Sequence, residues 1–488
     1  MILVALGRFV QFCLLLATLR FATSILAPEE IGKISIVVST IGFFSLFFLN
    51  PVGMFLNRRL LVWNSRGEVK KYLYFFWWYV FTVAILVCVI LGLVFKLNIW
   101  EPDINYFWFV SLVSLNILFA TINQVSIPSL NQLGYRSLFL GLTVATNFFS
   151  LVFALVSVYI FSYRAEYWMY GLLLGNLIIG FYAKKIFYEK LNVNDSFSLD
   201  YRQTKKIHLH GFFNYIWPIA LAVSLGWLQS QSYRYMVEYH LNLEILGLFV
   251  AGYGISAGLI GGLDSIFSTF FQPNFYRRIS SGNVLDYSDA WISYAKAVFP
   301  SLFLTSVFII CLAPDLTRLL LGERYQNVQN YVMWGAIVEM MRMSVGIFAL
   351  MAHALMKTKL LILPNFVGAF LSVILGWYFI DFWGGNGISI SLVLSFSVSA
   401  FLSFKVIQEY LNKKFSFTSL FLPIIFSLAL FGLSLIIVNI LTRLNLNPYI
   451  LALIHSVIIG IVFIFFLYKI LKPVIDAHEI EVTLLGHK

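Results

Sequence analysis

An acidic and a basic side chain, Glu339 and Arg342, stand three residues apart in the middle of a long apolar segment. A charge at the centre of a bilayer costs about 2.5–3.5 kcal/mol on insertion scales, so such groups face a cavity or a partner. Residues at i and i+3 lie on one face of a helix, which favours a self-neutralised pair. The alternative is functional: Arg342 faces a cavity and binds an anion, while Glu339 tunes it or carries a coupling proton.

Two further charges are predicted to lie within apolar segments. Arg20 falls in the outer half of segment 2–25, and Asp264 falls in the inner half of segment 244–272. We expect Arg20 to face a cavity rather than to extend to the membrane interface. A lone carboxylate at the depth of Asp264 is either paired with a basic residue of another helix or is a protonation site. The sequence leaves both interpretations open.

A group of polar and aromatic residues marks the outer end of segment 211–232. It consists of Gln229, Gln231 and Arg234, with Trp227 and Tyr233 among them. Amide and guanidinium groups can hydrogen-bond sugars, and aromatic rings can stack on them. An ordinary interfacial belt explains the aromatic residues equally well.

The charges within the apolar segments carry a positive surplus. Two deep acids, Asp264 and Glu339, stand against five cations, Arg8, Arg20, Lys33, Lys296 and Arg342. We expect Arg8, Lys33 and Lys296 to extend their charges to the membrane interface. A surplus of cations suits an anionic cargo, such as a diphosphate or an acidic sugar, better than a cationic drug.

No pattern of residues indicates an enzyme, a metal site or a cofactor. The three cysteines, Cys13, Cys88 and Cys311, all lie in apolar segments, and no CxxC pair, HExxH motif or phosphate-binding loop stands in a suitable context. The predicted external loops are short, whereas an enzyme acting on membrane glycans needs a large loop to hold its catalytic groups. The sequence therefore predicts a protein with no catalytic residues, no cofactor and no bound metal.

The composition requires a membrane protein with many spans. Of 488 residues, 60% are hydrophobic and 11% are charged, whereas soluble domains have about 45–50% and 25%. A spanning helix needs about 20 mostly apolar residues. Fourteen segments qualify: 2–25, 31–55, 72–95, 105–127, 138–162, 167–186, 211–232, 244–272, 291–313, 328–352, 359–380, 386–404, 419–441 and 448–468.

The distribution of basic residues tests this count. Alternate loops contain 22 and 6 Lys and Arg residues when the N-terminus is placed in the cytoplasm. Cytoplasmic loops carry the excess of Lys and Arg. The bias predicts that both termini are cytoplasmic, and it accounts for most of the net charge of +11 without a nucleic-acid partner. Pro51, after Asn50 in the second segment, marks an expected kink.

A short sequence pattern recurs in the two halves of the chain, and it indicates either an internal repeat or a recurrent interfacial helix start. The pattern L-x-x-E-x-x-G opens segments 31–55 and 244–272, at Leu26–Gly32 and Leu241–Gly247, 215 residues apart. Two six-helix halves of the same orientation indicate parallel repeats, as in transporters that alternate access between two lobes. We therefore predict an N-terminal lobe at 1–190, a cytoplasmic linker at 191–210, a C-terminal lobe at 211–410, two additional spans at 411–468 and a cytoplasmic tail at 469–488.

Several stretches resemble a known family. LAPEEIGKISIVVSTIGFF and NPVGMFLNRR near the N-terminus, then SQSYRYMVEYHLNLEILGLFVAGYGIS, LLGERYQNVQNY, MKTKLLILPNFVGAF and GGNGISIS, are similar to the polysaccharide-transport branch of the multidrug/oligosaccharidyl-lipid/polysaccharide exporter superfamily. The similarity is greatest to O-antigen flippases of the Wzx type. Where many relatives have Asp-Arg at the start of the second lobe's external loop, this chain has Tyr233-Arg234, which keeps only the cation.

The resemblance implies an all-α polytopic fold and a transport function. The substrate would be an undecaprenyl-pyrophosphate-linked oligosaccharide, moved by alternating access across the bacterial inner membrane, and a polysaccharide polymerase and a chain-length protein would be partners. Substrate would meet Arg20, Arg234, Arg342, Gln229 and Gln231, while Glu339 and Asp264 would serve ion coupling or charge pairing. The alternatives are an ion-coupled small-molecule exporter of the multidrug branch and a membrane glycan polymerase.

Overall fold

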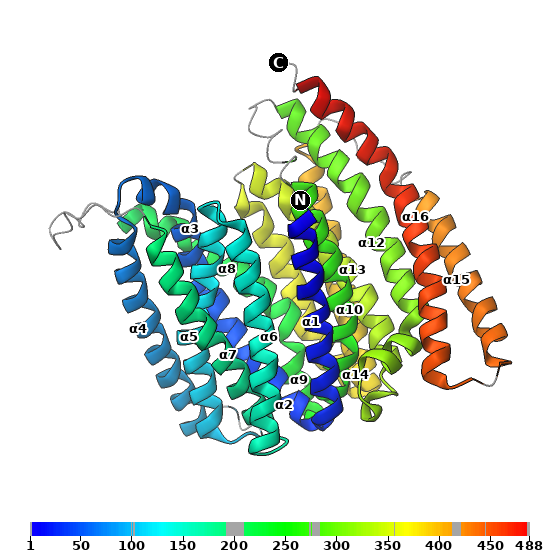
Figure 1. Cartoon of the computed structure of the whole chain (residues 1–488), viewed down its shortest axis with the longest axis horizontal. Coiled ribbons are helices and arrows are strands. Elements are labelled where there is room, and N and C mark those ends of the chain that lie inside the picture. The colour runs from blue at the N-terminus through cyan, green and yellow to red at the C-terminus, as the bar shows by residue number, and fades with distance from the viewer. Residues whose placement is uncertain are drawn as a thin grey trace. The chain divides into compact units, whose positions relative to one another are not determined.

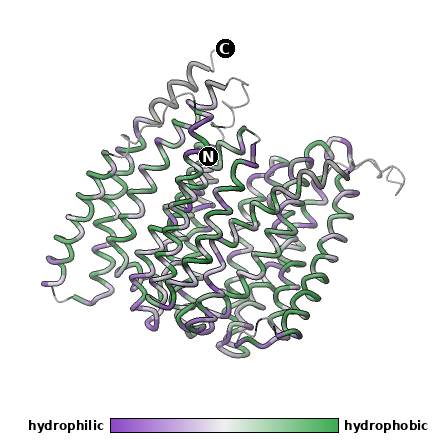
Figure 2. Tube along the Cα trace, turned by 180° about the vertical axis from the view of Figure 1, so that it is seen from behind, coloured by the Kyte–Doolittle hydropathy of each residue, from purple (hydrophilic) through white to green (hydrophobic). Residues whose placement is uncertain are grey.

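Long α-helices build the described part of the chain in this computed structural model, which places no strand among those residues. The structure describes residues 2–98, 100, 103–191, 209–272, 275, 284–355, 357–411, 421–444 and 446–485. In Figure 2 the helices are hydrophobic along most of their length, and hydrophilic residues gather mainly near helix ends and loops. The predicted inter-lobe linker at 191–210 lies largely outside the described residues.

The described residues of the first part of the chain, through the helix in which the second copy of the repeat ends, form ten α-helices and one π-helical turn (Figure 1). These are α1 (Ile2–Ile25), α2 (Pro28–Phe44), η1 (Ser45–Leu49), α3 (Asn50–Ser65), α4 (Val69–Lys96), α5 (Tyr106–Gln132), α6 (Arg136–Ile160), α7 (Ala165–Glu189), α8 (Leu209–Gln231), α9 (Tyr233–His240) and α10 (Leu243–Phe270).

The described remainder contains five α-helices and two 3₁₀ turns. These are α12 (Val284–Leu320), η3 (Glu323–Tyr325), α13 (Gln329–Ala354), η4 (Thr358–Leu361), α14 (Ile362–Gln408), α15 (Phe421–Thr442) and α16 (Pro448–Leu485). The last helix continues well into the segment predicted as a polar tail.

Apart from a few residues at their ends, the described residues of all fourteen predicted apolar segments lie on helical backbone. Eleven described stretches are long and apolar enough to cross a membrane, and one of them, Lys359–Gln408, contains two predicted segments. Gly384, with φ 54° and ψ −135°, interrupts the helix between those segments. A positive φ is accessible to glycine at little cost, so this residue permits the break. The prediction of an all-α polytopic membrane protein is confirmed.

The expected irregularity at Pro51 is a π-helical turn. Residues Ser45–Leu49 form η1, and Pro51 then occupies the first turn of α3. Proline has no N–H to donate, and its ring clashes with the carbonyl four residues earlier. A single wider turn before the proline relieves both problems while the helix continues.

Two compact units divide the chain. The first contains Met1–Thr18 and Ile25–Gly247, and the second contains Leu19–Ser24 and Leu248–Lys488. In the first unit α7 packs against α5 and α6, and Gly175 lets the backbones of α6 and α7 meet at Ser150. In the second unit α12 packs against α13, α15 and α16. The division into lobes at 1–190 and 211–410 remains a proposal that rests on the sequence repeat.

The two copies of the repeated L-x-x-E-x-x-G sequence meet each other within the first unit. A Cβ on Gly32 would overlap the carbonyl of Leu243, and a Cβ on Gly247 would overlap the carbonyl of Pro28. Pro28 and Leu243 occupy the third position of their copies, and the two glycines occupy the seventh. The contact is therefore reciprocal, as expected of two related elements that pack about a two-fold axis.

Candidate functional site

The charged pair on α13 is tightly bonded in the second unit. Arg342 donates from Nη2 to Oε2 of Glu339 at 2.6 Å and from Nε to Oε2 at 2.9 Å. The Tyr253 hydroxyl on α10 donates to Oε1 of the same carboxylate. The Glu339 side chain is only 2% exposed, whereas that of Arg342 is 40% exposed. The buried carboxylate of Glu339 thus accepts hydrogen bonds from residues of two helices, while the guanidinium of Arg342 is partly exposed.

This arrangement leaves Arg342 partly available to a ligand. Its Nη1 donates no hydrogen bond to any residue that the structure describes. An arginine fork can hold one anion with one edge while another edge remains free. Asp264 of α10 is half-buried and interacts electrostatically with Arg342, and among the described residues it forms no ion pair within 4 Å. Its role in charge pairing or ion coupling stays a prediction.

Arg234, at the start of α9, is surrounded by neutral oxygen atoms in the first unit. Its Nη1 donates to Oγ of Ser39 at 2.6 Å and to the Ser35 carbonyl at 3.4 Å, and its Nε donates to the Tyr233 hydroxyl at 3.2 Å. Among the described residues no carboxylate lies within ion-pair distance of this guanidinium. Unlike Arg342, Arg234 therefore keeps an uncompensated positive charge on a half-buried side chain.

Aromatic and hydroxyl side chains surround the α2–α8–α9 junction at Arg234. The Trp227 indole donates to the Ser39 carbonyl at 3.1 Å, and its ring packs on Phe43 with centroids 4.9 Å apart. The hydroxyls of Tyr235 and Thr40 are 2.8 Å apart. These contacts hold the first helical turns around Arg234, because each joins α8 or α9 to α2.

The two glutamines of the predicted site differ in their surroundings. Gln229 is 1% exposed, and its amide nitrogen has no hydrogen-bond partner within the described ranges. Gln231 is half-buried. A buried donor without a partner costs about 1–3 kcal/mol, so the Gln229 amide is available to a ligand oxygen or to water.

Arg20 bonds within the second unit. Its Nη1 donates to the carbonyl of Arg318 on α12 at 3.5 Å, and no carboxylate among the described residues pairs with it. Nearby on α1, the Thr23 hydroxyl accepts from the backbone N–H of Gly322 at 3.1 Å. Arg20 is half-buried and retains its charge, as does Arg234.

The other cations of the apolar segments are placed differently. Lys33 is paired with Glu29 at 2.5 Å and Glu30 at 3.0 Å, in the first two turns of α2. Arg8 donates to the Gln11 side chain at 3.0 Å, and Lys296 is exposed. The carboxylates of α2 thus reduce the positive surplus that the sequence predicts, since Lys33 contributes little net charge.

Sequence reasoning missed two sets of partners. It did not assign Ser39 to Arg234 or Tyr253 to Glu339, because each pair joins separate helices. It also missed a hydrogen-bonded chain of Asp315, His455 and Ser434 on α12, α16 and α15. The only signal for that chain was a histidine seven residues into an otherwise apolar segment, 448–468.

Glu238, near the end of α9, supports a prediction about pH. Burial raises the pKa of this carboxyl above its ordinary value, although a hydrogen bond from the Trp100 indole partly opposes the shift and Asp103 adds to it. A raised folded-state pKa means that ionisation of Glu238 weakens the fold. The protonated carboxyl therefore contributes to the free energy of unfolding at low pH, and this contribution is lost as the pH rises from about 4.3 through the folded-state pKa. Glu238→Gln should therefore flatten the dependence of the thermal midpoint on pH between about 4 and 7. Glu244→Gln, at an exposed position on α10, should leave that dependence as in the wild type.

Comparison with solved structures identifies the fold. The chain is similar to "Lipid II flippase MurJ, inward closed conformation", with 13% identity, a TM-score of 0.69, and coverage of 97% of this chain and 100% of that one. It is also similar to an inward-facing "multidrug resistance MATE family transporter of the MOP superfamily", with 13% identity, a TM-score of 0.60, and coverage of 82% and 94%. An outward-facing structure of the same description gives 12% identity, a TM-score of 0.53, and coverage of 84% and 93%.

No protein-family model and no curated protein sequence matches the chain. The structural likeness therefore defines the class of fold at low sequence identity. This class is a polytopic helical fold shared with a lipid II flippase and with MATE transporters.

Proposed function

We propose that this protein is a flippase for an undecaprenyl-pyrophosphate-linked oligosaccharide, an O-antigen unit or a similar polysaccharide repeat unit. The observation that carries the proposal is Arg234, an uncompensated cation held by neutral oxygens in an apolar setting. A diphosphate is the kind of group that such a guanidinium binds well. The fold supports the same class of function, because the chain is similar over almost its whole length to a lipid II flippase.

In this proposal different polar residues bind different parts of the substrate's head group. Arg234 binds the diphosphate or an acidic sugar, while the unpartnered amide of Gln229 and the half-buried Gln231 hydrogen-bond sugar hydroxyls. Arg342 offers its free Nη1 to an anionic oxygen while Glu339 holds the other edge of the guanidinium. Arg20 supplies a further cation, and Asp264 is the candidate for ion coupling.

The protein would work by alternating access in the bacterial inner membrane, with both termini in the cytoplasm, as the distribution of Lys and Arg predicts. The head group crosses while the lipid tail stays in the bilayer. A polysaccharide polymerase and a chain-length protein would receive the exported unit on the outer face.

The experiment that tests this function uses cells from which the gene has been deleted and which contain no redundant carrier. Surface polysaccharide and the amount and sidedness of lipid-linked oligosaccharide are measured. We expect surface glycan to be lost and the completed lipid-linked unit to accumulate on the cytoplasmic face. Lipid-linked units that reach the outer face but stay unpolymerised would point to a polymerase instead. Unchanged surface glycan would point instead to a small-molecule exporter. The similarity of the fold to a multidrug MATE transporter is compatible with that alternative.

Arg234 gives the sharpest variant for the same assay. Arg234→Gln should lower export of the lipid-linked unit about 10- to 100-fold, since a hydrogen bond to a charged group contributes about 1.5–3 kcal/mol. Arg234→Lys should keep part of the activity, because it retains the charge but loses the planar fork whose Nη1 bonds Ser39 and whose Nε bonds Tyr233. The matched control is Arg164→Gln, at a side chain 65% exposed and paired with Glu166, which should export normally. Equal activity of the Arg234→Gln and Arg164→Gln variants would remove Arg234 from the site.

A further inference from the structure

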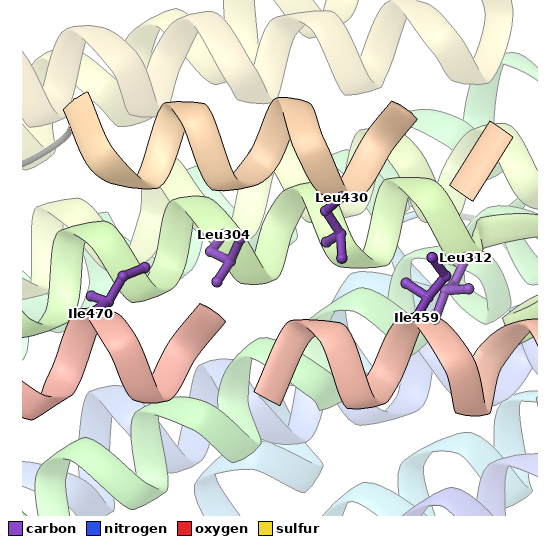
Figure 3. Close-up of a cluster of buried hydrophobic side chains, with 5 residues drawn as sticks. All are labelled: Leu304, Leu312, Leu430, Ile459 and Ile470. Carbon is purple, nitrogen blue, oxygen red and sulfur yellow. The ribbon is translucent and has the colours of Figure 1, made fainter. Parts of the chain in front are cut away.

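A polar chain of three side chains crosses the apolar contact between α12, α15 and α16. Nδ1 of His455 lies 2.5 Å from Oδ2 of Asp315, and Nε2 of the same ring lies 3.1 Å from Oγ of Ser434. The side chains of His455 and Asp315 are 2% and 14% exposed, and Ser434 is 4% exposed. The three helices that carry them otherwise meet through hydrophobic side chains, five of which appear in Figure 3 (Leu304, Leu312, Leu430, Ile459 and Ile470).

The order Asp–His–Ser matches that of a hydrolytic triad, but the surroundings do not suit a nucleophile. Ser434 lies within α15, where backbone N–H groups are used by the helix itself. Acyl transfer needs free N–H or amide donors around the developing oxyanion, and an interior helical turn offers none. The chemistry left to the three residues is therefore exchange of a proton rather than attack on a carbonyl.

The hydrogen bonds suit a group that changes its protonation state in place. Asp315 accepts from Nδ1–H of His455, which fixes the ring and leaves Nε2 as the variable position. A hydroxyl can donate to a neutral Nε2 or accept from a protonated Nε2–H. Ser434 thus satisfies both forms of the imidazole by rotation of its O–H bond alone. We propose that Asp315, His455 and Ser434 form a binding site for one proton, which is gained and lost at Nε2 of His455.

The described charged groups nearest the site are two arginines, Arg318 of α12 and Arg20 of α1, whose Nη1 donates to the Arg318 carbonyl. From α12, Cys311 lies beside Ser434, and Arg318, one turn beyond Asp315, donates to the Pro448 carbonyl of α16 at 3.4 Å. α15 carries no charged residue, and α16 has no other acid or base between Tyr449 and Tyr468. α13 also packs on α12, and its Glu339 and Arg342 bond to each other. The loaded Asp–His pair is neutral, and release of the proton leaves one negative charge near Arg318.

The position of the site suggests where the proton comes from. Asp315 lies five residues before the end of α12, and His455 lies seven residues after the start of α16. The distribution of Lys and Arg assigns these helix ends to the external side. The site would take up protons from outside. Its use as the energy source for export rests on the proposed function, whereas proton binding itself does not.

The first test needs no substrate. Full-length protein in lipid nanodiscs, labelled with ¹⁵N-histidine, is examined by NMR between pH 5 and 8, and His455 is assigned by difference from His455→Gln. We expect both the neutral ring and the imidazolium of His455 to be seen in the pH series, and their balance to change in Asp315→Asn, which alters the partner of Nδ1. Ser456→Ala, at a half-buried serine beside His455 whose hydroxyl oxygen has no hydrogen-bond partner among the described residues, should leave this result unchanged. A ring that keeps one protonation state throughout would overturn the proposal, and His455→Asn provides the assignment if the glutamine variant does not fold.

The second test measures coupling in proteoliposomes loaded with lipid-linked oligosaccharide. A pH gradient, acidic on the external side, should accelerate wild-type transport several-fold. The acceleration should be lost in His455→Gln while exchange without a gradient continues. If the wild type transports nothing, the proposed function fails but the NMR result still stands. If His455→Gln keeps the full acceleration, the site does not couple protons to transport.

Discussion

Replacing Gly247 with alanine should destabilise the protein by about 3 kcal/mol or more. A Cβ at this position would overlap the carbonyl of Pro28, which is backbone and cannot rotate away as a side chain can. Extra atoms in a tightly packed contact typically cost 1–3 kcal/mol, and more where the neighbour cannot move. The starts of α2 and α10 would have to separate. The midpoint of thermal unfolding of the purified protein measures the loss.

The reciprocal contact and a matched control make this prediction specific. Gly32→Ala should have a similar effect, because its Cβ would overlap the carbonyl of Leu243. Gly254→Ala, on the same helix as Gly247 but with nothing within 4 Å of the added Cβ, should be neutral or stabilising by up to about 1 kcal/mol. A Gly247→Ala protein as stable as Gly254→Ala would show that the close approach of α2 and α10 is not a feature of the folded protein.

Removing Arg342 should cost more stability than removing the charge of Glu339. Arg342→Met leaves a carboxylate that is 2% exposed without its cation, and breaking a buried pair from one side typically costs about 3–5 kcal/mol. Glu339→Gln leaves a guanidinium that is 40% exposed and can be hydrated. The amide still accepts from Tyr253, so we expect a loss of about 1 kcal/mol.

A double variant tests whether the larger loss of stability expected for Arg342→Met than for Glu339→Gln arises from the unpaired carboxylate. Glu339→Gln with Arg342→Met should recover most of the loss seen in Arg342→Met, because no buried charge is then left unpaired. The matched control is the pair formed by Arg164 and Glu166, in which the Arg164 side chain is 65% exposed. Replacing either residue of this pair, or both, should change stability by less than about 1 kcal/mol. Additive losses in the Glu339 and Arg342 double variant would contradict this account.

The reciprocal glycine contact also bears on how the repeat is used. Gly32 and Gly247 occupy the same position in two sequence copies 215 residues apart, and each accommodates the backbone of the other copy. Sequence comparison alone can treat such a pattern as a recurrent helix start. Its placement at a mutual contact supports the interpretation that the two copies are related elements.

The candidate site shows which partners local spacing can predict. The Glu339–Arg342 bond was expected from i, i+3 spacing, because such neighbours meet on any helix. The contact of Arg234 with Ser39 spans 195 residues and that of His455 with Asp315 spans 140. Nothing in the periodicity of one helix specifies the helix against which it packs, so these partners could not be predicted.

The sequence by itself determined the class of fold, the order of its helical segments, and the separation of segments 359–380 and 386–404, since apolar length acts locally. Tertiary structure decided which charges are compensated. Local spacing pairs Lys33 and Arg342 with carboxylates of their own helices, whereas tertiary structure left Arg20 and Arg234 among neutral oxygens and joined Asp315 to His455. The physical reason is that the electrostatic state of a charge in an apolar medium depends on atoms within a few ångströms, and distant segments of the chain supply those atoms.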